Sequence, residues 1–288
     1  MTSPRQAVAL LLIAGCASGA PATRPTSPPP APGPGLDPGR TQPKPEVVYR
    51  YPRSGAGIAR YAFARRDSVV ATMPSGEEQV QVLARTGYLT LTWIAADSGT
   101  KITTTVDSVV ADSGITVPAA VLDSARGTRW TGTRPPTGGL SGLTGTRTSL
   151  LGDQQRDQLT LLFPRLPPDG VRAGAHWRDS TEATARVSVF EVQESSVSTG
   201  DAGEPLPSGA LPIQMTASRS AAGEANQFGQ AINIKATGSD TLSYELAPDG
   251  RVLVAGGHRW TSLVMELTAI GQSVPAREIS SISMTLLR

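Results

Sequence analysis

Tyr88-Leu89-Thr90-Leu91-Thr92-Trp93 alternates large apolar residues with threonine. In an extended strand, Leu89, Leu91 and Trp93 share one face and both threonines point to the other. This period of two is typical of antiparallel sheets, which bury one face and leave the other in water. It recurs at Tyr49/Tyr51, Tyr61/Phe63, Val80/Val82, Ile102/Val106, Val187/Val189, Ile232/Ile234, Leu242/Tyr244/Leu246, Val252/Val254, Leu263/Met265/Leu267 and Ile282/Met284/Leu286. The sequence therefore predicts an all-β, mainly antiparallel fold.

Short turn signals lie between these runs, at Pro74-Ser75-Gly76, Asp97-Ser98-Gly99, Asp112-Ser113-Gly114 and Pro248-Asp249-Gly250. Glycine tolerates a positive φ and Asp or Ser caps the turn, so each segment is typical of a hairpin. Many short strands joined in this way predict a curved sheet, a half-barrel or a barrel. The stretch Ser195–Leu211, rich in Gly, Ser and Pro, is expected to be a mobile loop.

Two short helices are expected to interrupt the strands. Pro118–Arg126 begins with proline and is followed by Gly127, which is the usual asymmetry of helix ends. Thr148–Phe163 has the length of a helix and is stopped by Pro164. Its centre, Asp153–Gln158, is polar throughout, so we expect only one end of this helix to pack on the sheet.

Composition divides the chain into a leader, a spacer and a head. The 26 residues Pro21–Glu46 contain 10 prolines, whereas the 242 residues that follow contain 13. A segment rich in proline has few apolar side chains to bury and few backbone donors, so residues 16–46 are expected to form a disordered spacer. Residues 47–288 are expected to form a β-rich head, either as one domain or as two halves, 47–165 and 166–288.

The leader carries the most specific motif of the chain. Arg5 precedes the apolar run Ala7–Ala14, which is too short to span a bilayer and has the length of a signal peptide. Ile13-Ala14-Gly15-Cys16 resembles the lipobox of bacterial lipoproteins. The resemblance implies cleavage of the signal peptide 1–15, lipidation of Cys16 and anchoring in the membrane of the cell envelope. Ala17 resembles the class of lipoproteins sorted to the outer membrane of Gram-negative bacteria.

The head contains a weaker resemblance. The order Pro168…Val171-x-x-Gly174-x-x-Trp177, which precedes a predicted strand, resembles a segment of uncharacterised β-rich lipoproteins. At the level of the fold, the head is also similar to half-barrel carriers of the LolA/LolB type, in which a bent sheet holds acyl chains. This analogy implies an apolar or lipid ligand.

The inventory of reactive residues argues against an enzyme. Cys16 is the only cysteine, and His176 and His258 are the only histidines. Ser141 lies in Gly-Leu-Ser-Gly-Leu, which lacks the second glycine of a nucleophile elbow. Residues 98–101 match Ser-x-x-Lys but fall in a predicted hairpin turn. We therefore expect no catalytic, cofactor-binding or metal-binding residues.

Charge and pattern leave two kinds of function. The formal net charge of +2 gives no reason to expect nucleic acid as a partner. The near-miss phosphate loop Gly55–Arg60 precedes a strand pattern instead of a helix, and Tyr61 and Phe63 are expected on the core face. A non-catalytic head that binds an apolar ligand predicts a cavity of several hundred Å³ between sheet and helix. The alternative is a structural or assembly-partner lipoprotein that recognises another envelope protein.

Overall fold

The computed structural model describes residues 46–52, 55–97, 99–115, 117–146, 150–187, 190–227, 230–268 and 271–287. The predicted signal peptide (residues 1–15), the predicted lipidation site Cys16 and the predicted spacer up to residue 45 lie outside these ranges. Apart from Glu46, everything described below belongs to the predicted head, residues 47–288.

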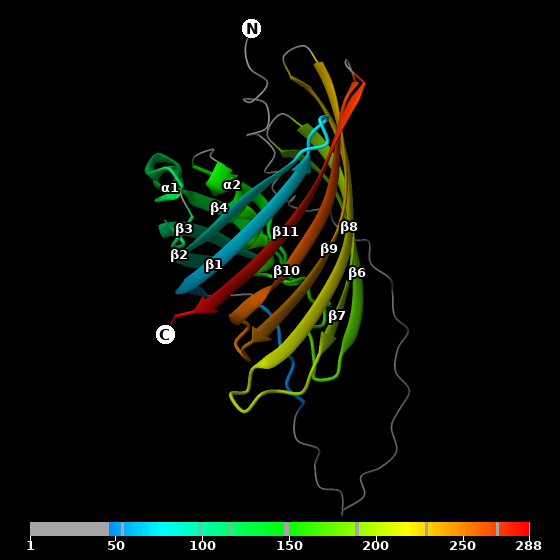
Figure 1. Ribbon diagram of the computed structural model, residues 1–288. Helices are drawn as coiled ribbons and strands as arrows, with labels where there is room; N and C mark the ends of the chain where they lie inside the picture. The colour runs from blue at the N-terminus through cyan, green and yellow to red at the C-terminus, as the bar shows by residue number, and fades with distance from the viewer. Residues whose placement is uncertain are drawn as a thin grey trace, which may run out of the picture.

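The head is built on one antiparallel sheet (Figure 1). Its strands are β1 (Ala56–Thr72), β2 (Glu78–Ala96), β3 (Gly99–Ala111), β4 (Arg129–Arg134), β5 (Ser141–Gly145), β6 (His176–Val187), β7 (Phe190–Ala202), β8 (Leu211–Gln227), β9 (Gln230–Leu246), β10 (Val252–Leu267) and β11 (Gln272–Leu286). The spatial order is β5-β4-β3-β2-β1-β11-β10-β9-β8-β7-β6. The sheet is curved and open, with β5 and β6 at its edges, so the all-β prediction is confirmed and a closed barrel is excluded.

The first and last strands are neighbours in the middle of the sheet. Tyr61 of β1 lies opposite Leu89 of β2 on one side and opposite Leu286 of β11 on the other. Residues 47–165 supply β1–β5 and both helices, and residues 166–288 supply β6–β11. The two halves of the sequence therefore meet at the β1–β11 pair within a single sheet.

The period-two pattern defines two faces. On β1, every second residue from Ala59 to Ala71 is buried, and the residues between them are half-buried or exposed. Leu89 and Leu91 of β2 are buried, whereas Thr92 is exposed, as the alternation predicts. We call the buried side of the sheet the concave face and the other side the convex face.

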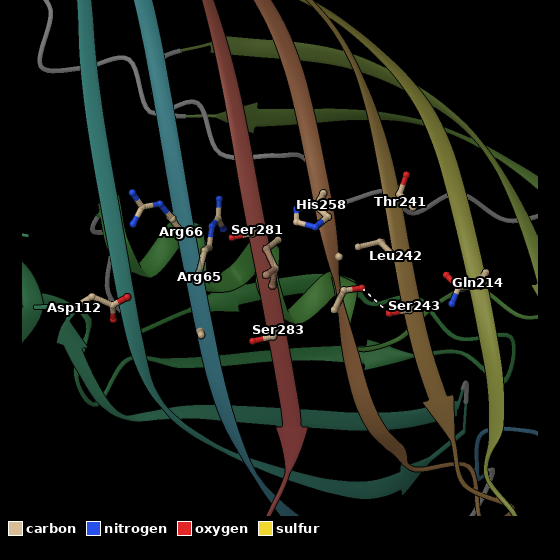
Figure 2. Close-up of a pocket in the computed structure, with 14 residues that line it drawn as sticks. Arg65, Arg66, Asp112, Gln214, Thr241, Leu242, Ser243, His258, Ser281 and Ser283 are labelled. Atoms are coloured by element: carbon tan, nitrogen blue, oxygen red, sulfur yellow. Dashed lines mark hydrogen bonds between the residues drawn. The ribbon is translucent and has the colours of Figure 1, made fainter. Parts of the chain in front are cut away.

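Both predicted helices are present, and one of them fills part of the concave face. They are α1 (Ala119–Ala125) and α2 (Leu150–Leu161). Leu151 and Leu159 of α2 belong to the same apolar cluster as Phe63 and Met284 of the sheet. Figures 1 and 2 both show α2 on the inner side of the curve.

The predicted strand at Tyr49 and Tyr51 is wrong. Tyr49 forms only an isolated antiparallel bridge with Val171. Both side chains are nevertheless buried, because the Tyr49 hydroxyl donates to the carbonyl oxygen of Gly209 at 2.8 Å and the Tyr51 hydroxyl donates to that of Pro164 at 2.9 Å. The alternation here reflects two separate buried anchors instead of a strand.

The predicted mobile loop Ser195–Leu211 is also wrong over most of its length. Ser195–Ala202 is the end of β7, Leu211 begins β8, and only residues 203–210 connect them. The hydroxyl-rich composition suits a strand because these residues pair across it: the side-chain oxygens of Thr199 and Thr216 are 2.8 Å apart. In addition, Asp112-Ser113-Gly114 leads from β3 toward α1 instead of closing a hairpin.

The concave face carries two apolar clusters. The first cluster joins the leucines of α2 to Phe63, Leu89 and Met284 of the sheet. The second cluster lies nearer the hairpin ends of the strands and consists of Ala71, Val192, Ile232, Ile234, Leu263, Val274 and Ala276. Figure 1 shows β9, β10 and β11 extending beyond both helices toward these ends.

Candidate binding site

A band of charged side chains crosses the concave face between the two clusters. On β1, Arg65 and Asp67 follow Phe63 of the first cluster and precede Ala71 of the second. The other members of the band are Arg85 on β2, Glu278 and Ser280 on β11, Arg259 on β10, Asp240 on β9, Arg219 on β8 and Glu194 on β7. The register aligns them, because Arg65 pairs with Arg85 and Ser280 pairs with both Asp67 and Arg259.

Asp67 is the centre of one half of the band. It accepts hydrogen bonds from Arg65 Nε at 2.8 Å, Arg85 Nη1 at 2.9 Å and Ser280 Oγ at 2.7 Å. Its side chain is 1% exposed. Burial alone would raise the pKa of Asp67, but the charges of Arg65 and Arg85 outweigh burial and hold it below the ordinary value. Asp67 is therefore an ionised carboxylate inside the head.

Arg85 is incompletely paired. Its side chain is 0% exposed, and Nη1 is bound to Asp67. Nε and Nη2, which we call the open nitrogens of Arg85, have no hydrogen-bond partner in the described part of the chain. Burial and then the neighbouring charge of Arg65 lower the pKa of Arg85 to about 10, so it is still a cation at neutral pH. Leaving such donors without acceptors is costly.

The other half of the band is centred on Asp240. Arg259 binds this carboxylate with two hydrogen bonds, from Nε at 3.0 Å and Nη2 at 3.2 Å. Arg219 Nε lies 3.2 Å from Asp240 Oδ2, and its Nη1 lies 3.7 Å from Glu194. Thr261 accepts a further hydrogen bond from Arg219 Nη2 at 3.4 Å. Arg259 therefore pairs with Asp240 through two hydrogen bonds, whereas Arg219 Nε lies near the same carboxylate without a hydrogen bond.

Helix α2 also places polar groups in the interior. Leu151, Gln155 and Leu159 recur at helical spacing on its buried side, and Gln158 lies beside Leu159. None of the four amide atoms of Gln155 and Gln158 has a hydrogen-bond partner within the described ranges. We call these groups the open amides of α2. The prediction that only one end of the helix packs on the sheet is wrong, because Gln155 and Gln158 of its polar centre are buried too.

The convex face carries a separate, open hollow of about 520 Å³ (Figure 2). His258, Ser281 and Thr241 lie around it in the close-up. Gly257 on β10 has a φ of +153°, and a Cβ there would clash with the carbonyl oxygen of Thr241, so the position requires glycine. His258 lies inside β10 and is exposed.

The residues weighed for chemistry remain apart. His176 begins β6 and pairs with Asp201 at the surface, His258 is exposed on the convex face, and Ser141 begins β5. Cys16 lies outside the described residues. Within the described ranges, no three His, Cys, Asp or Glu side chains lie close enough to hold a metal ion. Neither helix that the structure describes is long and apolar enough to cross a membrane.

The space between α2 and the sheet, where an apolar cavity was expected, holds the side chains of the first cluster. A concave hollow of about 40 Å³ lies instead at the second cluster. Val69, Leu263 and Ala276 line it, and Glu278 of the charged band closes one side. Its volume is close to that of a single water molecule in the liquid.

The charged band was not predicted from the sequence. Its signal was present, because Arg65 and Asp67 occupy the same strand parity as Tyr61, Phe63 and Val69. A charge at an inward position of an alternating strand must find a partner, since burying it alone is prohibitive. The partner depends on the strand register, which brings Ser280 to Asp67 across 213 residues of sequence.

The structure defines this chain as an all-β protein with an open sheet, and comparisons with known proteins assign it to no family. No family model and no curated protein matches it. DynF, from the dynemicin biosynthesis pathway of Micromonospora chersina, is 11% identical, with a TM-score of 0.21 over 86% of this chain and 90% of that chain. Neisserial surface protein A is 8% identical, with a TM-score of 0.18 over 81% of this chain and 99% of that chain. Likeness at this level carries no argument about fold or function.

Proposed function

We propose that the protein is a lipid-anchored protein of the cell envelope whose β-rich head binds an apolar or lipid ligand without catalysing a reaction. The lipobox at Cys16 supports the anchor, and Ala17 supports the outer membrane in a Gram-negative cell. Two or more acyl chains hold a protein stably on a bilayer, where a single chain binds only marginally. The spacer would let the head work away from the membrane surface.

The observation that carries the binding role is the poor fit of α2 to the wall that it covers. Its open amides, on Gln155 and Gln158, are buried on the same helix that supplies Leu151 and Leu159 to the first cluster. An unsatisfied buried polar group costs about 1–3 kcal/mol, so leucine at either position would make a more stable core. The unsatisfied amides lower the free energy needed to displace α2 from the sheet. Natural proteins commonly give up stability for function in this way.

In this proposal α2 is a displaceable cover. When it moves, the head opens and the concave apolar face becomes available to an acyl chain. The charged band would then contact the polar end of the ligand. The small void beside Glu278 is the space already present in the closed head.

The test compares ligand binding and stability in the full chain carrying Cys16→Ser, which removes the lipidation site. In this background we expect Gln155→Leu with Gln158→Leu to raise the unfolding free energy by about 1–3 kcal/mol per site and to weaken oleate binding at least about tenfold. Gln214→Leu, at an exposed position of β8, serves as the matched control and should leave oleate binding unchanged. Equal oleate binding by the double variant and the parent would contradict the cover.

A second candidate function is recognition of another envelope protein through the convex face. Trp260, Ile279 and Val80 are 44%, 52% and 61% exposed, and the first two form a cross-strand pair. An exposed tryptophan beside an exposed isoleucine is typical of a contact surface. Crosslinking in cells should then recover one envelope protein with the native chain and lose it with Trp260→Ser and Ile279→Ser. Recovery of lipid alone would favour the first proposal.

A further inference from the structure

The two halves of the charged band differ in one respect. Each half places two arginines around one aspartate, Asp67 in the first and Asp240 in the second. In the second half, Arg219 also reaches Glu194 and Thr261. In the first half, Glu278 lies 3.9 Å from Arg65. Within the described residues, the open nitrogens of Arg85 have no acceptor.

In the first half, Arg85 is therefore short of acceptors. Arg65 and Arg85 share the single carboxylate of Asp67. Glu278, the second carboxylate of this half, contacts Arg65 at 3.9 Å, and burial and the charge of Asp67 raise its pKa. A fully buried guanidinium with unpaired donors is stable only with a compensating partner. A planar fork of this kind is suited to a carboxylate or a phosphate.

The concave face offers a route to this point. Along β2 the inward positions change from buried Arg85, through half-buried Leu83, to exposed Gln81. Val69 of β1 lies opposite Gln81, and Ala71 of the second cluster lies two residues further along β1. An acyl chain along the second cluster would therefore place its head group beside Arg85.

We propose that Arg85 is the receptor for the anionic head group, carboxylate or phosphate, of an acyl ligand whose chain lies along the second cluster. This inference rests on the proposed function, since it names the class of ligand that the concave face takes. The open nitrogens of Arg85 donate to the head group, Asp67 holds the guanidinium in place through Nη1, and Leu83 borders the entrance.

The experiment measures binding of oleate and of methyl oleate, which has nearly the same chain and no charge, to the full chain carrying Cys16→Ser. We expect the parent to prefer oleate by about 10–100-fold, the range of a charge-assisted pair. Arg85→Gln should abolish this preference while still binding methyl oleate. Arg66→Gln, which removes an exposed arginine of the convex face, is the matched control and should keep the preference.

Three further arms make each outcome decisive. Lauryl phosphate should compete with oleate, whereas inorganic phosphate and acetate should not; competition by the chainless anions would replace the acyl ligand with a simple anion site. If Arg85→Gln does not fold, the 13C chemical shift of carboxyl-labelled oleate reports the titration of its carboxylate. In oleate bound to the parent, this carboxylate must stay ionised at a lower pH than in detergent micelles. An unshifted titration, or a preference that survives in Arg85→Gln, overturns the role of Arg85. Failure of both oleate and methyl oleate to bind overturns the proposed function itself.

Discussion

At the scale of single residues, the head contains buried ion pairs at positions where apolar side chains would give equal or greater stability. Asp67, Arg85 and Arg65 are almost fully excluded from water, and their mutual hydrogen bonds offset a large desolvation cost. Replacing buried ion pairs with apolar side chains is often neutral or stabilising. Their presence between two apolar clusters therefore fits a polar function better than a purely structural one.

Removing the central carboxylate is the sharpest residue-scale perturbation. Asp67→Asn removes the carboxylate that Arg65 and Arg85 both contact and should lower the unfolding free energy by about 3–5 kcal/mol at neutral pH. Chemical denaturation of the variant and the parent measures this difference. The control is Asp107→Asn, which removes the partly exposed carboxylate that pairs with Arg60. It should lower the unfolding free energy by less than about 1 kcal/mol.

The same residue predicts an acid dependence. The folded-state pKa of Asp67 lies below its ordinary value of 3.8, so its stabilisation is fully present above that value and is lost as the pH falls through the folded pKa. The stability of the parent should therefore drop in this acid range more steeply than that of Asp67→Asn. Parallel curves of unfolding free energy against pH would contradict an ionised Asp67 in the folded head.

At the scale of elements, the local sequence pattern predicts the strands but not how they pair in the sheet. The alternation in residues 88–93 is visible in the sequence and gives β2 its buried and exposed sides. The pairing of β1 with β11 joins residues more than 200 positions apart, such as Phe63 and Met284, and no local signal specifies it. The charged band depends on that pairing, which is why it was not predicted. Helix α2 was predicted, but its buried glutamines depend on the wall that it meets.

Glycine in β2 provides an element-scale test of the packing between strand and core. A Cβ at Gly87 would lie 2.7 Å from the Phe63 ring and would clash with the carbonyl oxygen of Ser108. Gly87→Ala should therefore destabilise the head by about 1–3 kcal/mol, as overpacked cores do. At Gly256 the nearest atom to an added Cβ is 3.2 Å away, so Gly256→Ala should cost less. Thermal unfolding of both variants and the parent measures the two losses.

At the scale of the whole molecule, the predicted leader and the described head suggest a division of labour. Cys16 would fix the chain to a bilayer, and the spacer would carry an open sheet whose inner face is partly covered by one ill-fitting helix. Cys16→Ser should move the protein from the membrane fraction to the soluble fraction and abolish its labelling by palmitate. Retention of both properties would contradict lipidation at Cys16.

Displacement of α2 by ligand is the central claim, and hydrogen exchange measures it most directly. The full chain carrying Cys16→Ser is exchanged with and without oleate, and peptides covering α2 are compared with peptides covering β1 and β11. We predict that oleate speeds exchange of the α2 amides while the two central strands keep their protection. Bound oleate with unchanged or greater protection of α2 would contradict its role as a cover.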